Sequence, residues 1–165
     1  MENKKIQFND ERIIKVEINN YGDYIVIAAD DPNFFDRFQE MCKIIIELSE
    51  NASSDIESVE KEFAGKNEIK YKLEKSSKLS ELNIGFSEDV KKAIESVFGN
   101  DLFLKYFKEI YKQIPDFLPD GDCLMEFIDQ ITPIIEEVFE KKLEARNRIN
   151  KERMKKYKPQ DFSKR

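Results

Sequence analysis

The sequence contains no histidine, and this absence removes the side chain that enzymes most often use as a general base. Without histidine there is no Ser-His-Asp triad, no Cys-His nucleophile pair and none of the common histidine-containing zinc sites. The five glycines are scattered and form neither a P-loop nor a dinucleotide-binding motif, so no phosphate-binding loop is expected. We therefore expect a non-enzymatic protein with no catalytic residue, no metal ligand and no cofactor.

Cysteines and long apolar runs are also scarce. Cys42 and Cys123 are the only two cysteines, and neither belongs to a CxxC motif. The first residues are polar and charged, unlike a signal peptide, so we expect two reduced, buried thiols in a cytoplasmic protein, with a disulfide as the less favoured alternative. No apolar run approaches the roughly 20 residues that cross a bilayer, and we expect no membrane partner.

Acidic residues are abundant but do not form a recognisable site. Glu136 and Glu137 are neighbours in the sequence, which is typical of a solvated helix face rather than of a spaced catalytic pair. The segment around Asp120 and Gly121 has some features of a calcium-binding loop. In that register, however, Leu118 and Phe127 occupy two positions that need oxygen ligands, so we reject this interpretation.

Charge is distributed very unevenly along the chain. The sequence contains 28 basic and 34 acidic residues, a net charge of −6. Residues 141–165 contain eleven basic and three acidic residues, a net charge of +8, which leaves −14 on residues 1–140. This pattern predicts an acidic body with a basic C-terminal extension.

The first 30 residues contain the only β-like pattern. Ile14, Val16 and Ile18 alternate with polar residues, turn-forming residues follow at 19–23, and residues 24–28 form a second β-branched run. We predict a β-hairpin within residues 4–29, with residues 4–8 as a possible third strand.

Amphipathic helical patterns fill the rest of the chain. The first predicted helix begins at Asp30-Asp31-Pro32 and ends before Asn51–Ser54, where Ser54 opens a second helix that ends near Gly65. Residues 66–86 contain few apolar positions and predict a weak helix followed by a connection. Ser87 is expected to cap a further helix.

The remaining helices are delimited by clear stop signals. Gly99 is expected to end the helix that begins at Ser87, and Pro115 to end a helix that begins at Asn100 or Asp101. Asp122 is expected to cap the last long helix, with Pro133 kinking or restarting it and Thr132 as a local cap. The predicted fold is therefore mainly α: the hairpin leads into a bundle of about five helices, residues 1–143 form one domain, and residues 144–165 form a basic, largely solvated helical extension.

Three motifs follow one another between Ala93 and Lys158. They are Ile94-x-x-Val97-Phe98-Gly99 with a following aromatic helix, then Phe127-Ile128-x-x-Ile131-x-Pro133-Ile134-Ile135, and last Arg146-x-Arg148 with Arg153-x-x-Lys156-Tyr157. In this order they resemble the tail assembly chaperones of long-tailed, siphovirus-type phages and prophages of Gram-positive bacteria. The N-terminal hairpin and the Phe-rich helix near Asp36 also suit small members of that family.

The resemblance implies a chaperone that works in the cytoplasm of the bacterial host. Such proteins cover the long, helical tape measure protein and keep it soluble until tail tube subunits replace them. The tape measure protein is then the expected partner, with the tail tube protein and other copies of the chain as further partners. The candidate partner-binding residues, or their support, are Phe98, Phe103, Phe107, Phe127 and Ile131, and the candidate electrostatic contacts are Arg146, Arg148, Arg153 and Lys156.

Two alternatives stay open at the level of sequence. Aromatic residues at helical spacing are also typical of an ordinary core, and spacing alone does not separate a core from a partner groove. The basic segment 141–165 also allows a small nucleic-acid-binding regulator, although the acidic body disfavours a polyanion. A structural tail accessory protein is a further possibility within the resemblance.

Overall fold

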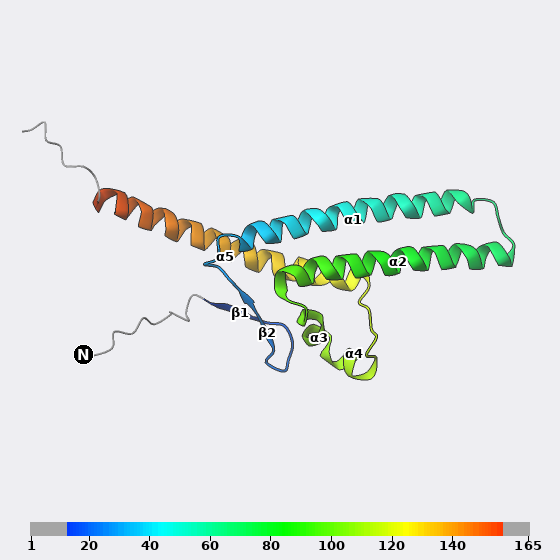
Figure 1. Ribbon diagram of the computed structural model, residues 1–165, viewed down its shortest axis with the longest axis horizontal. Helices are drawn as coiled ribbons and strands as arrows, with labels where there is room; N and C mark the ends of the chain where they lie inside the picture. The colour runs from blue at the N-terminus through cyan, green and yellow to red at the C-terminus, as the bar shows by residue number, and fades with distance from the viewer. Residues whose placement is uncertain (1–12, 157–165) are drawn as a thin grey trace, which may run out of the picture.

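The computed structural model describes residues 13–156 and begins with the predicted β-hairpin (Figure 1). β1 (Ile14–Glu17) pairs antiparallel with β2 (Tyr24–Ile27), and Val16 lies opposite Ile25. The turn is held by Asn19, whose Oδ1 accepts hydrogen bonds from the Tyr21 and Asp23 amides at 2.8 and 3.2 Å. The hairpin prediction is confirmed, while the suggested third strand at residues 4–8 lies outside the described residues.

Two long helices, α1 (Phe34–Glu62) and α2 (Ile69–Phe98), form an antiparallel pair that projects from the body as an arm (Figure 1). The predicted break at Asn51–Ser54 is wrong, because α1 continues through it. Asn51, Ser53 and Ser54 are exposed, and each such residue costs only a fraction of a kcal/mol in a helix. Packing of α1 along α2 outweighs this cost.

The predicted weak helix and connection at residues 66–86 are also wrong, since this stretch is the first half of α2. Its apolar positions are sparse because only one narrow side faces α1. Ion pairs support that side: Lys75 contacts Glu60 at 2.5 Å and Lys78 contacts Glu62 at 2.7 Å. Ser87, predicted as a cap, is instead buried inside α2, and its hydroxyl has no hydrogen-bond partner among residues 13–156.

Gly99 ends α2 as predicted, with φ +104° and ψ 152°, a backbone conformation that is essentially restricted to glycine. The single helix expected after it is in fact two short ones, α3 (Leu102–Tyr106) and α4 (Lys108–Gln113). The interruption lies at Phe107, where φ is −105° and ψ is 33°. Its ring packs against Phe103 and Phe117, with centroids 6.0 and 5.5 Å away, and so joins both short helices to the following turn.

The last helix, α5 (Gly121–Lys156), crosses the body and then extends beyond it (Figure 1). Asp120, rather than the predicted Asp122, caps it by accepting a hydrogen bond from the Cys123 amide at 2.9 Å. The helix continues through Pro133, whose ring lies on the exposed side. Thr132 does not cap a restarted helix; its hydroxyl donates to the Ile128 carbonyl at 2.7 Å.

One apolar core joins the hairpin, α1, α2, α3 and α5, and its members include Ile27, Phe38, Ile94, Phe103 and Ile135. The fold is therefore mainly α with an N-terminal β-hairpin, as the sequence predicts. Within residues 13–156, no helix combines the length and the apolar character that a membrane crossing requires.

Two glycines provide a matched test of this packing. A Cβ atom placed on Gly121 would lie 2.6 Å from Cε1 of Phe86, whereas one placed on Gly85 would meet no atom within 4 Å. We expect Gly121→Ala to lower the free energy of unfolding by about 1–3 kcal/mol through overpacking. Gly85→Ala should raise it by about 0.5–1 kcal/mol, because glycine inside a helix is costly. Urea unfolding followed by circular dichroism measures both values, and stabilisation by both substitutions would contradict the close approach of α5 to α2.

Candidate functional site

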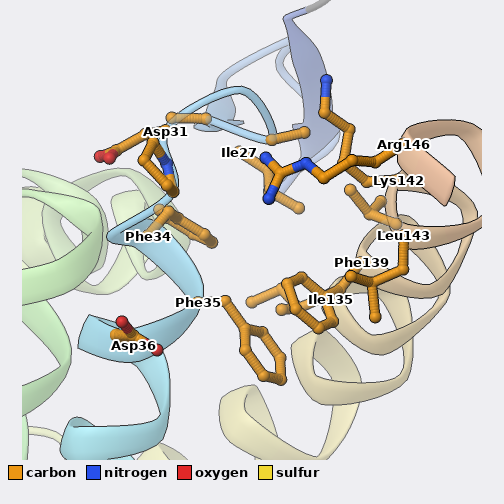
Figure 2. Close-up of a pocket in the computed structure, with 14 residues that line it drawn as sticks. Ile27, Asp31, Phe34, Phe35, Asp36, Ile135, Phe139, Lys142, Leu143 and Arg146 are labelled. Carbon is orange, nitrogen blue, oxygen red and sulfur yellow. The ribbon is translucent and has the colours of Figure 1, made fainter. Parts of the chain in front are cut away.

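An apolar pocket of about 130 Å³ opens between the loop that precedes α1, the first turn of α1 and the middle of α5 (Figure 2). Ile27, Phe34 and Ile135 form its buried part. Phe35 and Phe139 line it from opposite helices, and their rings stack with centroids 3.7 Å apart and an interplanar angle of 6°. The stack joins α1 to α5 where the C-terminal half of α5 begins to leave the body.

The rim of the pocket is charged. Asp31 and Asp36 lie on its α1 side, and Lys142 and Arg146 lie on its α5 side (Figure 2). Asp31 already contacts the Arg37 guanidinium at 2.7 Å, and this hydrogen bond, with one from the Asn33 amide, lowers the pKa of its carboxyl group.

The two rim cations on α5 differ in their pairing. Lys142 is paired with Asp30, which joins α5 to the loop before α1. Within the part of the chain that the structure describes, the Arg146 guanidinium has no ion-pair partner. The α5 side of the pocket therefore offers one free cation beside an apolar surface.

The pocket is suited to binding rather than to chemistry. Its polar groups are carboxylates and cations, and its volume is close to that of an apolar cavity of about 150 Å³ that holds one benzene molecule. One large apolar side chain of a partner therefore fits, with a neighbouring carboxylate placed against Arg146. Among residues 13–156 no group of three or more Cys, Asp or Glu side chains is arranged to hold a metal ion.

The structure brings the predicted aromatic residues together, but in the core. Phe103 is fully buried, Phe127 and Ile131 are each 3% exposed, and Phe98 and Phe107 are half-buried. Phe127 packs edge-on against Phe98 and Phe103, with centroids 5.5 and 5.7 Å away. Phe103, Phe127 and Ile131 thus lie behind the surface and support it, whereas Phe98 and Phe107 reach the surface in part.

The predicted basic contacts lie on α5, but on different sides of it. Arg146 lies at the pocket, and Arg153, seven residues further on, lies on the same side of the helix. Arg148 points to the opposite side, and all three residues are exposed. Lys156 is exposed at the last residue of α5.

Sequence reasoning did not single out the residues that form the pocket. Phe35 and Phe139 were recognisable only as members of apolar helical stripes, and Leu143 as the residue where the stripe of the last helix fades. A useful signal is that Phe35 widens the stripe of the first helix, which indicates burial on a second side.

The two cysteines are free thiols, as expected, but each is half-buried rather than buried. Burial raises the pKa of Cys42, and Glu136 on α5 raises it further. The pKa of Cys123 is also raised, first by burial and then by its hydrogen bond to Asp120. A raised pKa reduces the thiolate fraction at neutral pH, so neither residue has the environment of an activated nucleophile.

No family model matches this sequence. No curated protein and no solved structure shows significant similarity to it. The resemblance to tail assembly chaperones therefore stays a prediction from the motifs between Ala93 and Lys158.

The stacked rings beside the pocket give a testable coupling. We expect Phe35→Leu and Phe139→Leu each to destabilise the protein, and the double variant to lose less than the sum of both effects. The expected coupling is about 0.5–1.5 kcal/mol, the usual contribution of an aromatic pair beyond its buried area. A double-mutant cycle measured by urea unfolding gives this value, and strict additivity would show that the rings do not interact in solution.

Proposed function

We propose that this protein is a tail assembly chaperone of a long-tailed phage or prophage, which binds the tape measure protein without covalent chemistry and keeps it soluble. The observation that carries the proposal is the apolar pocket between α1 and α5, which opens at the surface beside an unpaired cation. The motif resemblance names the partner, and the pocket supplies a way to bind it.

The pocket continues along α5 as a strip of mixed character. Leu143, Arg146, Ile149 and Arg153 follow one another at spacings of three, three and four residues, so they share one side of the helix. Leu143 is 40% exposed and Ile149 is 42% exposed, and they alternate with the two arginines. An amphipathic helix with an apolar ridge and flanking carboxylates would be complementary to this strip and would place one side chain in the pocket.

The charge of the whole chain suits this role. A long apolar helical protein aggregates through its exposed ridges, and covering them with a protein of net charge −6 leaves a complex that repels its copies. The basic end of α5 would then be the part that a tail tube subunit approaches when it replaces the chaperone.

A co-expression experiment tests the proposal. Expressed with the tape measure protein of the same phage or prophage, the wild-type chain should keep that protein soluble and co-purify with it. Leu143→Asp places a carboxylate at the pocket mouth and should reduce the co-purified amount at least tenfold, because an unpaired charge against an apolar surface is costly. The matched control is Leu104→Asp on α3, whose side chain is 54% exposed and lies outside the pocket.

Circular dichroism melts of both variants verify that each is folded. Failure of the wild-type chain to solubilise or bind the tape measure protein would overturn the proposed function. If both substitutions reduced the co-purified amount equally, the tape measure protein would still be the partner, but it would bind elsewhere than at the pocket.

A nucleic-acid-binding regulator is the second candidate, favoured by the eight basic residues among positions 141–156, which lie on an extended and largely exposed helix. It requires an affinity for duplex DNA that falls steeply as salt increases and that is lost when residues 146–165 are deleted. A flat titration at low salt eliminates it.

A further inference from the structure

The side of α5 that faces away from the core residues Leu124, Phe127 and Ile131 carries a continuous acidic surface in its first half. Asp122, Glu126, Asp129, Pro133, Glu136 and Glu140 follow one another at spacings of four, three, four, three and four residues, and all are exposed. This spacing keeps them on one face and is the spacing of a helix–helix seam. Residues 121–140 contain six acidic residues and no basic one, a net charge of −6.

The second half of α5 has the opposite charge on the same face. Residues 141–156 contain eight basic and two acidic residues, a net charge of +6. The face continues through Glu144, Asn147, Lys151 and Met154, with Arg148 and Lys155 beside it, and Met154 is 73% exposed. Within residues 13–156, neither Lys151 nor Lys155 forms an ion pair, and the same is true of Glu126 and Asp129.

The helix dipole does not account for this separation of charge. Acidic residues are favoured near a helix N-terminus and basic residues near a C-terminus, but the effect falls off within the first and last turns. It explains Asp122 and Lys155, whereas Asp129, Glu136 and Glu140 lie two or more turns from either end. The exposed charges in the middle of α5 need another reason.

We propose that two copies of this chain pair through α5, antiparallel, with the outer faces in contact across a twofold axis near residues 138–139. This register places Lys151 of one copy beside Glu126 and Asp129 of the other, and Lys155 beside Asp122. The twofold axis repeats every contact, so each basic half lies on an acidic half. The paired helices overlap over their whole length, about 54 Å for the 36 residues of α5.

The charge order along α5 identifies the occupant as a second copy. A nucleic acid is negative along its whole length, so the acidic half of the same face would repel it. An occupant that satisfies both halves must be basic where α5 is acidic and acidic where α5 is basic, in antiparallel order. α5 itself has this order. None of the residues of this face lines the pocket.

The dimer should be sensitive to salt. Each exposed ion pair contributes little alone, and the contact depends on many of them at once. Raising the salt concentration from about 0.1 M to about 1 M shortens the Debye length from about 10 Å to about 3 Å. We expect the dimer dissociation constant to rise at least tenfold over this range, measured by sedimentation equilibrium against the 19.5 kDa mass of one chain.

Charge reversal of the two halves tests the register. Lys151→Glu with Lys155→Glu lowers the net charge of residues 141–156 from +6 to +2, and Glu126→Lys with Asp129→Lys changes that of residues 121–140 from −6 to −2. Each double variant alone should dimerise at least tenfold more weakly than the wild-type chain, because like charges then face each other. An equimolar mixture of the two variants should recover a dimer, since position 151 of each variant then faces side chains of opposite charge at positions 126 and 129 of the other.

The matched control is Lys72→Glu with Lys92→Glu, which makes the same change in net charge at exposed positions of α2 and should leave dimerisation unchanged. Circular dichroism verifies the fold of each variant, and the salt series on the wild-type chain tests the proposal even if one variant does not fold. Each of three outcomes would overturn the pairing. The wild-type chain could be monomeric at low salt, the charge-reversal variants could dimerise as well as the wild-type chain, or the mixture of the two variants could stay monomeric. None of these outcomes depends on the tape measure protein, so they are separate from the test of the proposed function.

Discussion

Edge-to-face packing of aromatic rings at one junction determines how the helices of this protein are placed. The Phe98 ring, at the end of α2, packs against Phe34 and Phe38 of α1 at 6.2 and 6.4 Å and against Phe127 of α5 at 5.5 Å. Phe127 in turn contacts Phe103 of α3 at 5.7 Å. Such a pair contributes about 0.5–1.5 kcal/mol beyond the burial of its area. Because the four helices meet here, the distal arm formed by α1 and α2 and the free half of α5 both extend from one fixed point (Figure 1).

The same junction gives α5 its separate surfaces. One side of the helix is held against the core through Leu124, Phe127 and Ile131, all nearly or fully buried. Its first half therefore cannot rotate, and the directions of the pocket side and of the acidic outer side are set together. Because α5 continues beyond the body as one helix, its exposed second half presents the same two sides. One helix can in this way present an apolar and basic strip to one partner and a charge-segregated face to another.

The sequence predicted the elements whose signals are local and missed those that depend on a distant partner. The hairpin follows from the alternation of Ile14 and Val16, and the end of α2 follows from Gly99. The continuity of α1 and α2 did not follow, because Asn51–Ser54 and the sparse apolar residues of 66–86 look like loops. Their helical state comes from each other, through packing and through contacts such as Lys75 with Glu60.

The candidate site could be predicted only in part, again because it depends on residues that are distant in the sequence. Arg146 was named from the basic run of the third motif, and it lies at the pocket. The apolar part of the pocket depends on Phe35 meeting Phe139, two residues more than a hundred positions apart whose stripes each indicate only burial. Phe103 and Phe127, predicted as part of a partner surface or of its support, are buried. Helical spacing alone does not distinguish a residue that faces the core from one that faces a partner.

Burial of these aromatic residues is compatible with a chaperone that must later be displaced. A wide groove lined by Phe98, Phe103 and Phe127 would expose a large apolar patch whenever the partner is absent, and such patches promote aggregation. A pocket for one side chain, with Arg146 at its rim, leaves a surface that water solvates in the free protein. It also limits the affinity, because few groups are fully desolvated on binding. A chaperone that binds through several weak and salt-dependent contacts can be released step by step as a competing subunit advances along the partner. A chaperone that bound through its own core would have to unfold before it could dissociate.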